Sequence, residues 1–557
     1  MLARVAGYVD EAALVCAVNV RNSNLRRAQL AFGANWAGEW AATVAIGVVA
    51  FRHGGAAAVG LVGVARMIPA AIVAPFAGTV ADRMRREAIL AWVSVLRWLT
   101  LSIAAAASFA GGPVAGIYVA LVAATVAQTL VRPAHSALLP SLCATPAELA
   151  SANVGRGFLD SMATLIGPLI AALLLQVSGP GAVFAAAATA SAAAAGFASR
   201  VRYETAPRLA GVSVLRGLRG VGEGVRVIAA DRGLATITAL TAVQTFTRGA
   251  LLVFSVVISI KLLGTGGPGV GVLTAAVGAG AVAGSMSAAL LVGRGALARW
   301  LGLGVALWGA PLLGIGLLPY LGVAIVMLVV VGVGNALVDV GAFTLPARLA
   351  DDAVLARVFA AFEGIITLGV AAGALATPAL IGALGVRGAL VVIGVIAPLG
   401  ALASWSALRA LDCRVRVRDA DVDMLRSVPM LRQLPLATVE QLAARLQRSE
   451  VSTGASVFEQ GDEGDDFYVI EHGHAEVVGD GTTVRMLGPG DGFGEIALLR
   501  GGGRTTTVRA VTPLTLRTLS RAAFAAAVVG YSASAGAADR VIAAHLSHFS
   551  PGSSGDA

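Results

Sequence analysis

Phe493–Ala510 reads FGEIALLRGGGRTTTVRA, and this stretch decides how the C-terminal part of the chain folds. Glycines stand on both sides of the apolar run EIALLR, which predicts a short helix between two tight turns. Glu495 and Arg504 lie at the two ends of that segment. A helix start preceded by glycine presents free backbone N–H groups to an anion, and a guanidinium pairs with phosphate oxygens in fork geometry. The stretch therefore predicts a site for a small molecule that carries a phosphate.

Short alternating patterns surround this stretch and indicate a small β domain. Apolar and polar residues alternate between 455 and 520, with glycines marking the turns. Helical periodicity precedes the strands at 424–449, and helix is expected again at 521–547. The charged stretch 412–423 is predicted to be a linker, and the polar tail 548–557 is predicted to be disordered.

The order of helix, β-roll and helix over residues 424–547 resembles the cyclic nucleotide-binding domain family. The turn Gly461–Asp465, the strand Phe467–Ile470 and Gly473 support the resemblance. The cassette 493–510 resembles, in residue type and spacing, those of cyclic nucleotide-gated channels and of the regulatory subunits of cyclic AMP-dependent kinase. The resemblance implies a regulatory ligand, cyclic AMP or cyclic GMP, bound by a β-roll flanked by helices.

The same resemblance assigns roles within the cassette. It implies that Glu495 holds the ribose 2′-hydroxyl and that Arg504 holds the cyclic phosphate. In this family a threonine at the position of Thr505 can favour cyclic GMP, but some cyclic AMP receptors carry it too, and we expect cyclic AMP. The residues implied to bind the nucleotide are Gly494, Glu495, Ile496, Ala497, Arg504, Thr505 and Thr506.

The first three quarters of the chain have the composition of a membrane protein. The 557 residues are 57% hydrophobic and 13% charged, with a mean hydropathy of +0.81, whereas soluble domains are about 25% charged. The apolar residues form blocks of about 20, the length that spans a bilayer as a helix. Twelve spans are predicted, at 28–50, 56–80, 88–110, 113–135, 155–177, 180–198, 236–262, 267–292, 299–318, 320–346, 358–383 and 386–408.

These spans divide into two halves of six, 28–198 and 236–411, after an N-terminal segment 1–27 and around a central loop 199–235. Arginines gather in alternate loops, and this positive-inside bias places both termini and the C-terminal domain in the cytoplasm. We therefore expect a multi-pass protein of the inner (plasma) membrane. The net charge of +9 lies largely in these loops and does not indicate a nucleic-acid partner. The abundance of alanine, glycine and arginine is typical of a high-GC bacterium.

The loop between the second and third spans resembles the signature of the major facilitator superfamily, G-x-x-x-D-R-x-G-R-R/K. Gly78, Asp82, Arg83 and Arg86 match it, while Arg85 stands where the family usually has glycine. In that family the loop controls the switch between inward and outward states through ion pairs. Ordinary positive-inside charge is the alternative interpretation, although orientation alone requires no acidic residue.

Two further segments resemble members of this superfamily. One is the connection 132–153 between the fourth and fifth spans, which resembles that of exporters of siderophores and macrolides. The other is Gly167-Pro168 in the fifth span, which resembles the antiporter signature G-P-x-x-G-G with Ala171 and Ala172 in place of both glycines. The resemblance implies two six-helix halves and the proton-coupled export of a small molecule.

Charged residues inside the spans are functional candidates because each is costly in lipid. Glu39 and Asp339 are candidate proton or substrate sites, with Arg248 as their counter-charge; they fall on the first, tenth and seventh spans, which line the cavity in this superfamily. A structural ion pair is an open alternative for each of them. Other charged residues in the spans are expected to be mainly structural: Arg66, Arg97, Asp160 and Glu363.

Motifs of known enzymes are not found: the chain has no G-x-S-x-G, H-E-x-x-H or Walker sequence, so we expect neither an enzyme nor a catalytic cofactor. Three scattered cysteines predict no metal site. The sequence as a whole predicts a secondary transporter regulated by cyclic nucleotide, with the lipid bilayer, a small-molecule substrate and protons as partners. Two alternatives stay open: a membrane-anchored nucleotide receptor that moves no substrate, and a transporter with a structural C-terminal domain.

Overall fold

The computed structural model describes most of the chain in two compact units, Met1–Arg409 and Ala410–Ala557. The division falls close to the predicted end of the second six-helix half at Leu411. The described residues are 22–83, 85–143, 146–202, 214–292, 296–350, 352–432, 434, 439, 442–443, 445–479, 482–500 and 502–529.

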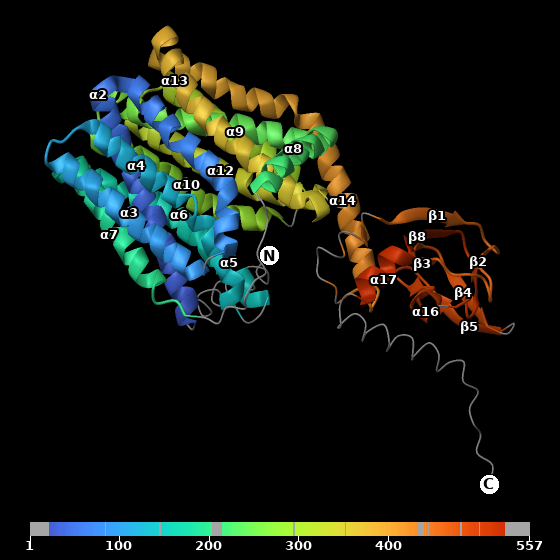
Figure 1. Cartoon of the computed structure of the whole chain (residues 1–557). Coiled ribbons are helices and arrows are strands. Elements are labelled where there is room, and N and C mark those ends of the chain that lie inside the picture. Colours follow the sequence, from blue (N-terminus) through green and yellow to red (C-terminus); the bar gives the residue numbers. More distant parts are fainter. Residues whose placement is uncertain are drawn as a thin grey trace, which may run out of the picture. The chain divides into compact units, whose positions relative to one another are not determined.

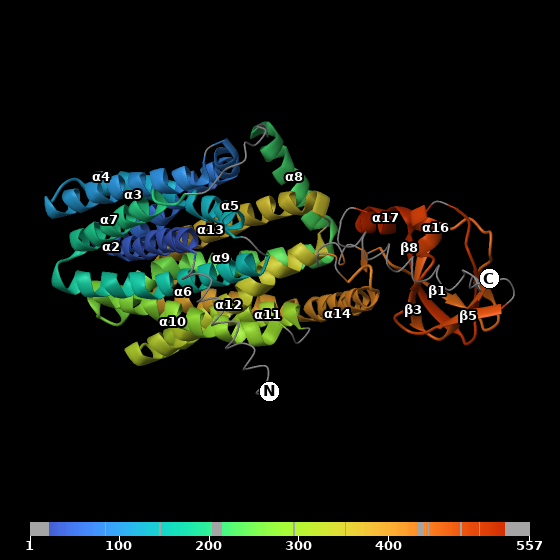
Figure 2. The same cartoon turned by 90° about the horizontal axis from the view of Figure 1, so that it is seen from below.

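Helices form the described part of the first unit, and Figures 1 and 2 show the long ones running side by side as a bundle. Most of the described connections between consecutive helices are short, and several contain glycine. The helices are α2 (Ser23–Arg83), α3 (Arg86–Phe109), α4 (Val114–Gln128), α5 (Val131–Leu142), α6 (Pro146–Val177), α7 (Pro180–Ala198), α8 (Val214–Ala230), α9 (Arg232–Val257), the π-helix η1 (Ile258–Leu262), α10 (Gly266–Val292), α11 (Leu297–Leu317), α12 (Leu321–Leu349), α13 (Asp352–Ala403) and α14 (Trp405–Ser427), which runs on into the second unit.

Ten stretches of helix in the described residues are long and apolar enough to cross a membrane. Two of them, Ser23–Pro69 and Arg357–Ala403, have 47 residues each, about twice the length that a bilayer requires. The helices that contain them are broken by non-helical backbone at Gly54 and Gly55 in α2 and at Gly385 in α13. These breaks lie in the short loops predicted after the first and eleventh spans. The total of twelve spans stays a prediction.

Glycine allows the helices of the first unit to pack closely. A Cβ atom on Gly249 of α9 would lie 2.0 Å from the backbone oxygen of Val370, and one on Gly373 of α13 would lie 1.9 Å from that of Phe246. Glycines make the same contact between α10 and α12. Lipid gives no hydrophobic drive for helix association, so small residues at the contacts favour packing of backbone against backbone.

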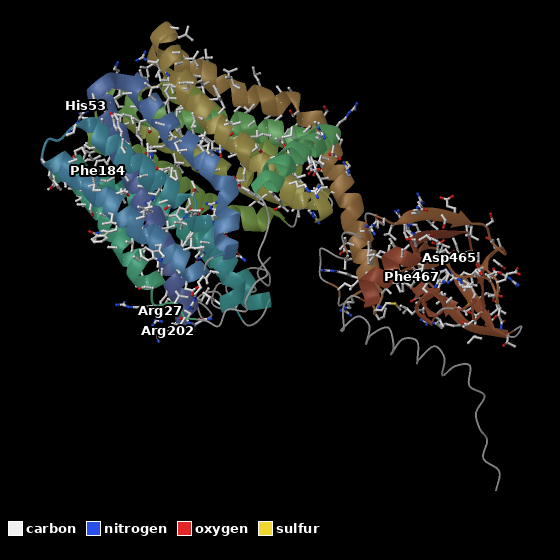
Figure 3. All side chains as sticks on the ribbon, in the orientation of Figure 1. Arg27, His53, Phe184, Arg202, Asp465 and Phe467 are labelled. Carbon is white, nitrogen blue, oxygen red and sulfur yellow. The ribbon has the colours of Figure 1, made fainter. Side chains whose placement is uncertain are left out.

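The second unit is a roll of two four-stranded sheets, with strand orders β1-β8-β3-β6 and β2-β7-β4-β5. Phe467 of β3, labelled in Figure 3, is buried and stacks on Phe524 with ring centroids 4.4 Å apart. The strands are β1 (Gln447–Val451), β2 (Ser456–Phe458), β3 (Asp466–His472), β4 (Ala475–Gly479), β5 (Thr482–Leu487), β6 (Gly492–Phe493), β7 (Thr507–Ala510) and β8 (Leu514–Ser520); the helices are α16 (Glu495–Arg500) and α17 (Arg521–Val529).

Two boundaries differ from the sequence predictions. The stretch 412–423, predicted to be a linker, continues helix α14, because it contains no glycine or proline and Asp421 forms an ion pair with Arg517 of β8 at 3.4 Å. The helical pattern predicted for 424–449 is also too long. Helix α14 ends at Ser427, and β1 already begins at Gln447, where it pairs with β8.

Candidate functional site

The cassette 493–510 forms much of the wall of a pocket of about 650 Å³ in the second unit. Strand β6 pairs with β3, which places Phe493 opposite Tyr468, and α16 begins two residues later at Glu495. Strand β7 then returns between β2 and β4. The fold thus brings both ends of the cassette to one cavity.

All seven residues predicted to bind a nucleotide line this pocket. Four of the seven are buried: Glu495, Ala497, Arg504 and Thr506. Thr505 is exposed, and Gly494 and Ile496 are half-buried. A carboxylate and a guanidinium therefore lie on the wall of the same partly enclosed space.

Gly494 forms the turn between β6 and α16. Its φ of 92° lies in the left-handed region, which side chains other than glycine adopt only with strain. A Cβ atom at this position would lie 2.6 Å from Nη1 of Arg504 and 3.2 Å from the backbone oxygen of Asp466. Glycine is required here both by the backbone conformation and by the close approach of the arginine.

The guanidinium of Arg504 is held by backbone oxygens and aromatic rings. Its Nη1 donates to the carbonyl oxygen of Gly494 and its Nη2 to that of Asp466, each at 2.8 Å. Its Cζ lies 4.1 Å from the ring centre of Phe458 and 5.7 Å from that of Tyr468. These cation–π contacts stabilise the charge, and the two backbone oxygens and two rings together fix its position.

Arg504 makes no ion pair with a carboxylate in the part of the chain that the structure describes, and its Nε has no hydrogen-bond partner there. Burial lowers the pKa of Arg504, whereas Tyr468 and Asp466 raise it. Burial also raises the pKa of the Tyr468 hydroxyl, and the charge of Asp466 adds to that effect. A guanidinium has five N–H donors, so donors remain for an anion after the two backbone bonds.

The loop that carries Arg504 is fixed at its backbone. The N–H of Arg504 donates to the oxygen of Asp462 at 2.8 Å, and the N–H of Gly461 donates to the oxygen of Arg504 at 2.9 Å. The turn 461–465 therefore orients the arginine. Arg521 of α17 holds the same turn, because its Nη2 donates to the oxygen of Gly464.

Sequence reasoning missed several residues of this site. Phe458 and Tyr468 support Arg504, although they stand far before it in the chain, and only the fold brings them together. Their aromatic type in strands was the one signal available. Strands β4 and β5 add further lining: Val477, Val484, Arg485 and Leu487.

In the first unit, the predicted proton or substrate site Glu39 lies between two arginines. Its carboxylate accepts from Nη2 of Arg66 at 2.5 Å and from Nη1 of Arg97 at 2.8 Å. Arg66 also donates from Nε to the hydroxyl of Thr125 at 2.8 Å. The structure thus pairs Glu39 with two arginines that we expected to be mainly structural, and not with Arg248.

The other two candidates in the spans lie apart from this network. Asp339 is exposed on α12 and accepts from Nδ2 of Asn335 at 2.8 Å. Arg248 is half-buried on α9, and within the described residues no ion pair joins it to Asp339. Asp160, expected to be structural, forms an ion pair with Arg132 at 2.8 Å.

Two predicted features fall outside what the structure describes. Helix α2 ends at Arg83 and α3 begins at Arg86, so the described backbone of residues 78–83 in the predicted gating loop is helical. The side chains of the four loop-motif residues are not among those described: Gly78, Asp82, Arg83 and Arg86. The C-terminal part of the helix predicted at 521–547 lies beyond the last described residue, Val529.

Comparisons with known proteins agree with the geometry of the second unit. Residues 448–531 match the family model described as cyclic nucleotide-binding domain. The cAMP-dependent protein kinase regulatory subunit of Yarrowia lipolytica is 43% identical over 79 residues, covering 14% of this chain and 21% of that protein. An uncharacterised protein of Mycobacterium tuberculosis is 41% identical over 103 residues, covering 18% and 20%.

The chain therefore spans about a fifth of the length of the curated relatives it matches. Among solved structures, the regulatory domain of Toxoplasma gondii PKA with cAMP is similar at 25% identity, covering 24% of this chain and 52% of that one, with a TM-score of 0.21. The matched segment contains the pocket-lining Glu495 and Arg504. The C-terminal unit of this chain carries a cyclic nucleotide-binding domain.

Proposed function

We propose that this chain is a secondary membrane transporter that is controlled by cyclic nucleotide bound in its second unit. One observation carries the regulatory part of the proposal. The buried Arg504 has no carboxylate partner in the described residues, and it shares a pocket with the buried Glu495. A buried charge without a counter-ion is costly, so this pocket favours an anionic ligand that forms an ion pair with Arg504.

A cyclic nucleotide matches the two charged side chains of the pocket, Arg504 and Glu495. Its phosphate carries the negative charge that Arg504 requires, and its ribose 2′-hydroxyl is a donor for Glu495. We propose cyclic AMP over cyclic GMP, because the relatives that match this segment include several cAMP-dependent protein kinase regulatory subunits. The remaining cassette residues would contact the phosphate and the base from α16 and from the start of β7.

The transport part of the proposal rests on the first unit. Ten stretches of helix are long and apolar enough to span a membrane, and the breaks in α2 and α13 support a division into twelve. We propose a major facilitator fold that exports a small molecule in exchange for protons, with Asp339 as a proton or substrate site, Glu39 as a charged group held by Arg66 and Arg97, and the loop 78–86 as gate. We assign the chain no catalytic step.

The distribution of charge supports a location in the inner membrane with both termini in the cytoplasm. Arg27 and Arg202 lie at one end of the bundle and His53 lies at the other (Figure 3). Nη1 of Arg27 donates to the oxygen of Arg200 at 2.8 Å, so arginines gather where the two ends of the first half meet. This is the end that the positive-inside rule places in the cytoplasm.

The regulatory part is tested by nucleotide binding. Full-length protein in lipid nanodiscs is titrated with cyclic AMP and with cyclic GMP in a calorimeter, beside Arg504→Ala and the control Arg509→Ala, which removes an exposed arginine of β7. We expect cyclic AMP to bind to the wild type and to Arg509→Ala but not to Arg504→Ala. Equal binding by both variants, or no binding of either nucleotide by the wild type, would refute the proposed ligand site.

The transport part is tested in proteoliposomes under an imposed proton gradient. Fluxes of labelled organic compounds are compared with and without cyclic AMP on the cytoplasmic side. A flux that changes with cyclic AMP, and that is present but unresponsive in Arg504→Ala, supports regulated transport. Nucleotide binding without any proton-driven flux would favour the membrane-anchored receptor instead.

A further inference from the structure

The first unit contains a cavity of its own, with about 880 Å³ of empty space that is partly open, bordered by α2, α6, α9, α10, α11 and α12. It therefore lies between the two predicted six-helix halves. Most of its lining is apolar, with branched aliphatic side chains from several helices: Val44, Ile46, Leu251, Leu252, Val256 and Leu273. Such a surface accommodates an apolar molecular body and orients it only through a few polar groups.

The charged groups on this lining are both cationic. Arg66 and Arg248 line the cavity, and no aspartate or glutamate is among the described residues that do so. Arg66 is held by Glu39, which also accepts from Arg97, so these three groups together carry one positive charge. The cavity wall thus has a net positive charge before Arg248 is counted.

Arg248 makes no hydrogen bond or ion pair within the described residues. The carboxylates of Asp339 and Glu363 act on it electrostatically from α12 and α13, but from beyond ion-pair distance, and neither lines the cavity. A guanidinium at a membrane span is costly unless a partner compensates for the lost hydration. An anion in the cavity would provide that partner.

Among the described residues, two indole N–H groups on the cavity wall are also unused hydrogen-bond donors. Trp40 and Trp308 line the cavity, and the Nε1 atom of each is buried without a partner in the part of the chain that the structure describes. Trp308 is only 3% exposed. An indole N–H can only donate a hydrogen bond, so a ligand that pairs with it must supply an acceptor.

The hydroxyl groups on the cavity wall, unlike the indole N–H groups, already have hydrogen-bond partners. Those of Thr43, Thr164, Ser255 and Thr274 already donate to backbone oxygens of their own helices. The lining therefore holds two guanidinium groups and two unpaired indole N–H donors in an apolar surround. A ligand that satisfies this lining carries hydrogen-bond acceptors and a negative charge.

We propose that this cavity binds an amphipathic organic anion, a molecule with one acidic group on an apolar body. The acid group would lie near Arg248 and Arg66, and the apolar body would lie against α9 and α10. This inference rests on the proposed transport function, because it names the substrate class of that function. A cation of the same shape would face two guanidinium groups and is excluded by their repulsion.

The test uses three probes with one aromatic body: 2-naphthoate, its neutral amide and the cation 2-naphthylmethylammonium. Dissociation constants are measured by equilibrium dialysis on full-length protein in nanodiscs of phosphatidylcholine, with empty nanodiscs subtracted. We expect naphthoate to bind about 10- to 100-fold more tightly than the other two, the range for one charge-assisted bond. Equal binding of the three probes, or binding of none, overturns the inference.

Variants locate the site. Arg248→Gln is expected to remove most of the preference for naphthoate, and Arg248→Lys to retain part of it. Arg387→Gln, which removes an exposed arginine of α13 that does not line the cavity, is the matched control and should bind as the wild type does. If Arg248→Gln keeps the full preference while it remains folded by circular dichroism, the inference fails. An Arg248→Gln that does not fold leaves the decision to Arg248→Lys, in which unchanged affinity for naphthoate contradicts the proposed pairing.

The same probes separate this inference from the proposed function. Naphthoate that binds with Arg248 dependence but is never carried across proteoliposomes supports the anion site and refutes transport. A proton-driven flux of the ammonium probe, without binding of naphthoate, supports transport and refutes the anion site.

Discussion

At the scale of single residues, the nucleotide pocket depends on how closely Gly494 and Arg504 approach each other. The arginine donates to the carbonyl oxygen of Gly494 at 2.8 Å, and the glycine has no Cβ atom to prevent this. The backbone conformation of Gly494, which begins α16, therefore also positions the guanidinium of Arg504.

Gly494→Ala is therefore expected to weaken nucleotide binding. The new Cβ atom would lie 2.6 Å from Nη1 of Arg504, and the φ of 92° would be strained, at a cost of about 1–3 kcal/mol. We expect the dissociation constant for cyclic AMP, measured by calorimetry, to rise about 5- to 150-fold. Gly502→Ala is the control, because a Cβ atom there meets nothing within 4 Å. Equal affinities in the two variants would show that the approach of Arg504 is not required.

The residue scale also shows how far the sequence could lead. The seven cassette residues lie in one contiguous segment, so their spacing alone was enough to predict that they share a site, and they line one pocket. Phe458 and Tyr468 could not be found in this way. They reach Arg504 through the pairing of β3 with β6 and of β2 with β7, which is long-range information that no local pattern contains.

At the scale of secondary-structure elements, the close contact of α9 with α13 depends on small residues. Gly249→Ala would place a Cβ atom 2.0 Å from the oxygen of Val370, so the two helices must separate. We expect a fall in melting temperature in detergent, with a free-energy cost of about 1–3 kcal/mol, as for overpacking in other cores. Gly116→Ala on α4, which has open space at the Cβ position, should melt as the wild type does or slightly higher.

Elements of the first unit are also joined by charge. Glu39 and Arg66 lie on α2, on the two sides of its glycine break, and Arg97 lies on α3. Arg97→Met leaves Glu39 paired with Arg66, whereas Glu39→Gln leaves two buried guanidinium groups without their carboxylate, and breaking a buried pair in this way costs about 3–5 kcal/mol. Thermal unfolding in detergent should show a large loss for Glu39→Gln and a smaller one for Arg97→Met. A Glu39→Gln variant that is at least as stable as Arg97→Met would contradict this account.

Secondary structure was easier to predict than its limits. The alternating strands and the apolar helices follow from periodicity, which is a local property. The stretch 412–423 was assigned to a linker because it is charged, yet its arginines and aspartates do not oppose a helix, and the buried Asp421 is compensated by Arg517. Strand β1 was missed, because its sequence QRSEV holds only one apolar residue, Val451, and so shows no alternation.

At the scale of the whole molecule, the proposal requires that the sites of the two units are coupled in free energy. If cyclic AMP changes the affinity of the first unit for its anion, the anion must change the affinity for cyclic AMP by the same factor. Allosteric coupling is typically about 1–3 kcal/mol, or about 5- to 150-fold. The sequence predicts the nucleotide site, but no pattern in it measures the coupling between that site and the first unit.

We therefore predict that 2-naphthoate at saturation shifts the dissociation constant of cyclic AMP at least about fivefold on full-length protein in nanodiscs. Saturating cyclic AMP should shift the constant for 2-naphthoate by that same factor, in the same direction. Arg248→Lys should reduce both shifts together, whereas Arg387→Gln should leave both unchanged. Because a ligand that binds two states equally shifts nothing, two sites that each bind but show no mutual effect would be uncoupled. The second unit would then be a nucleotide-binding domain with no control over transport.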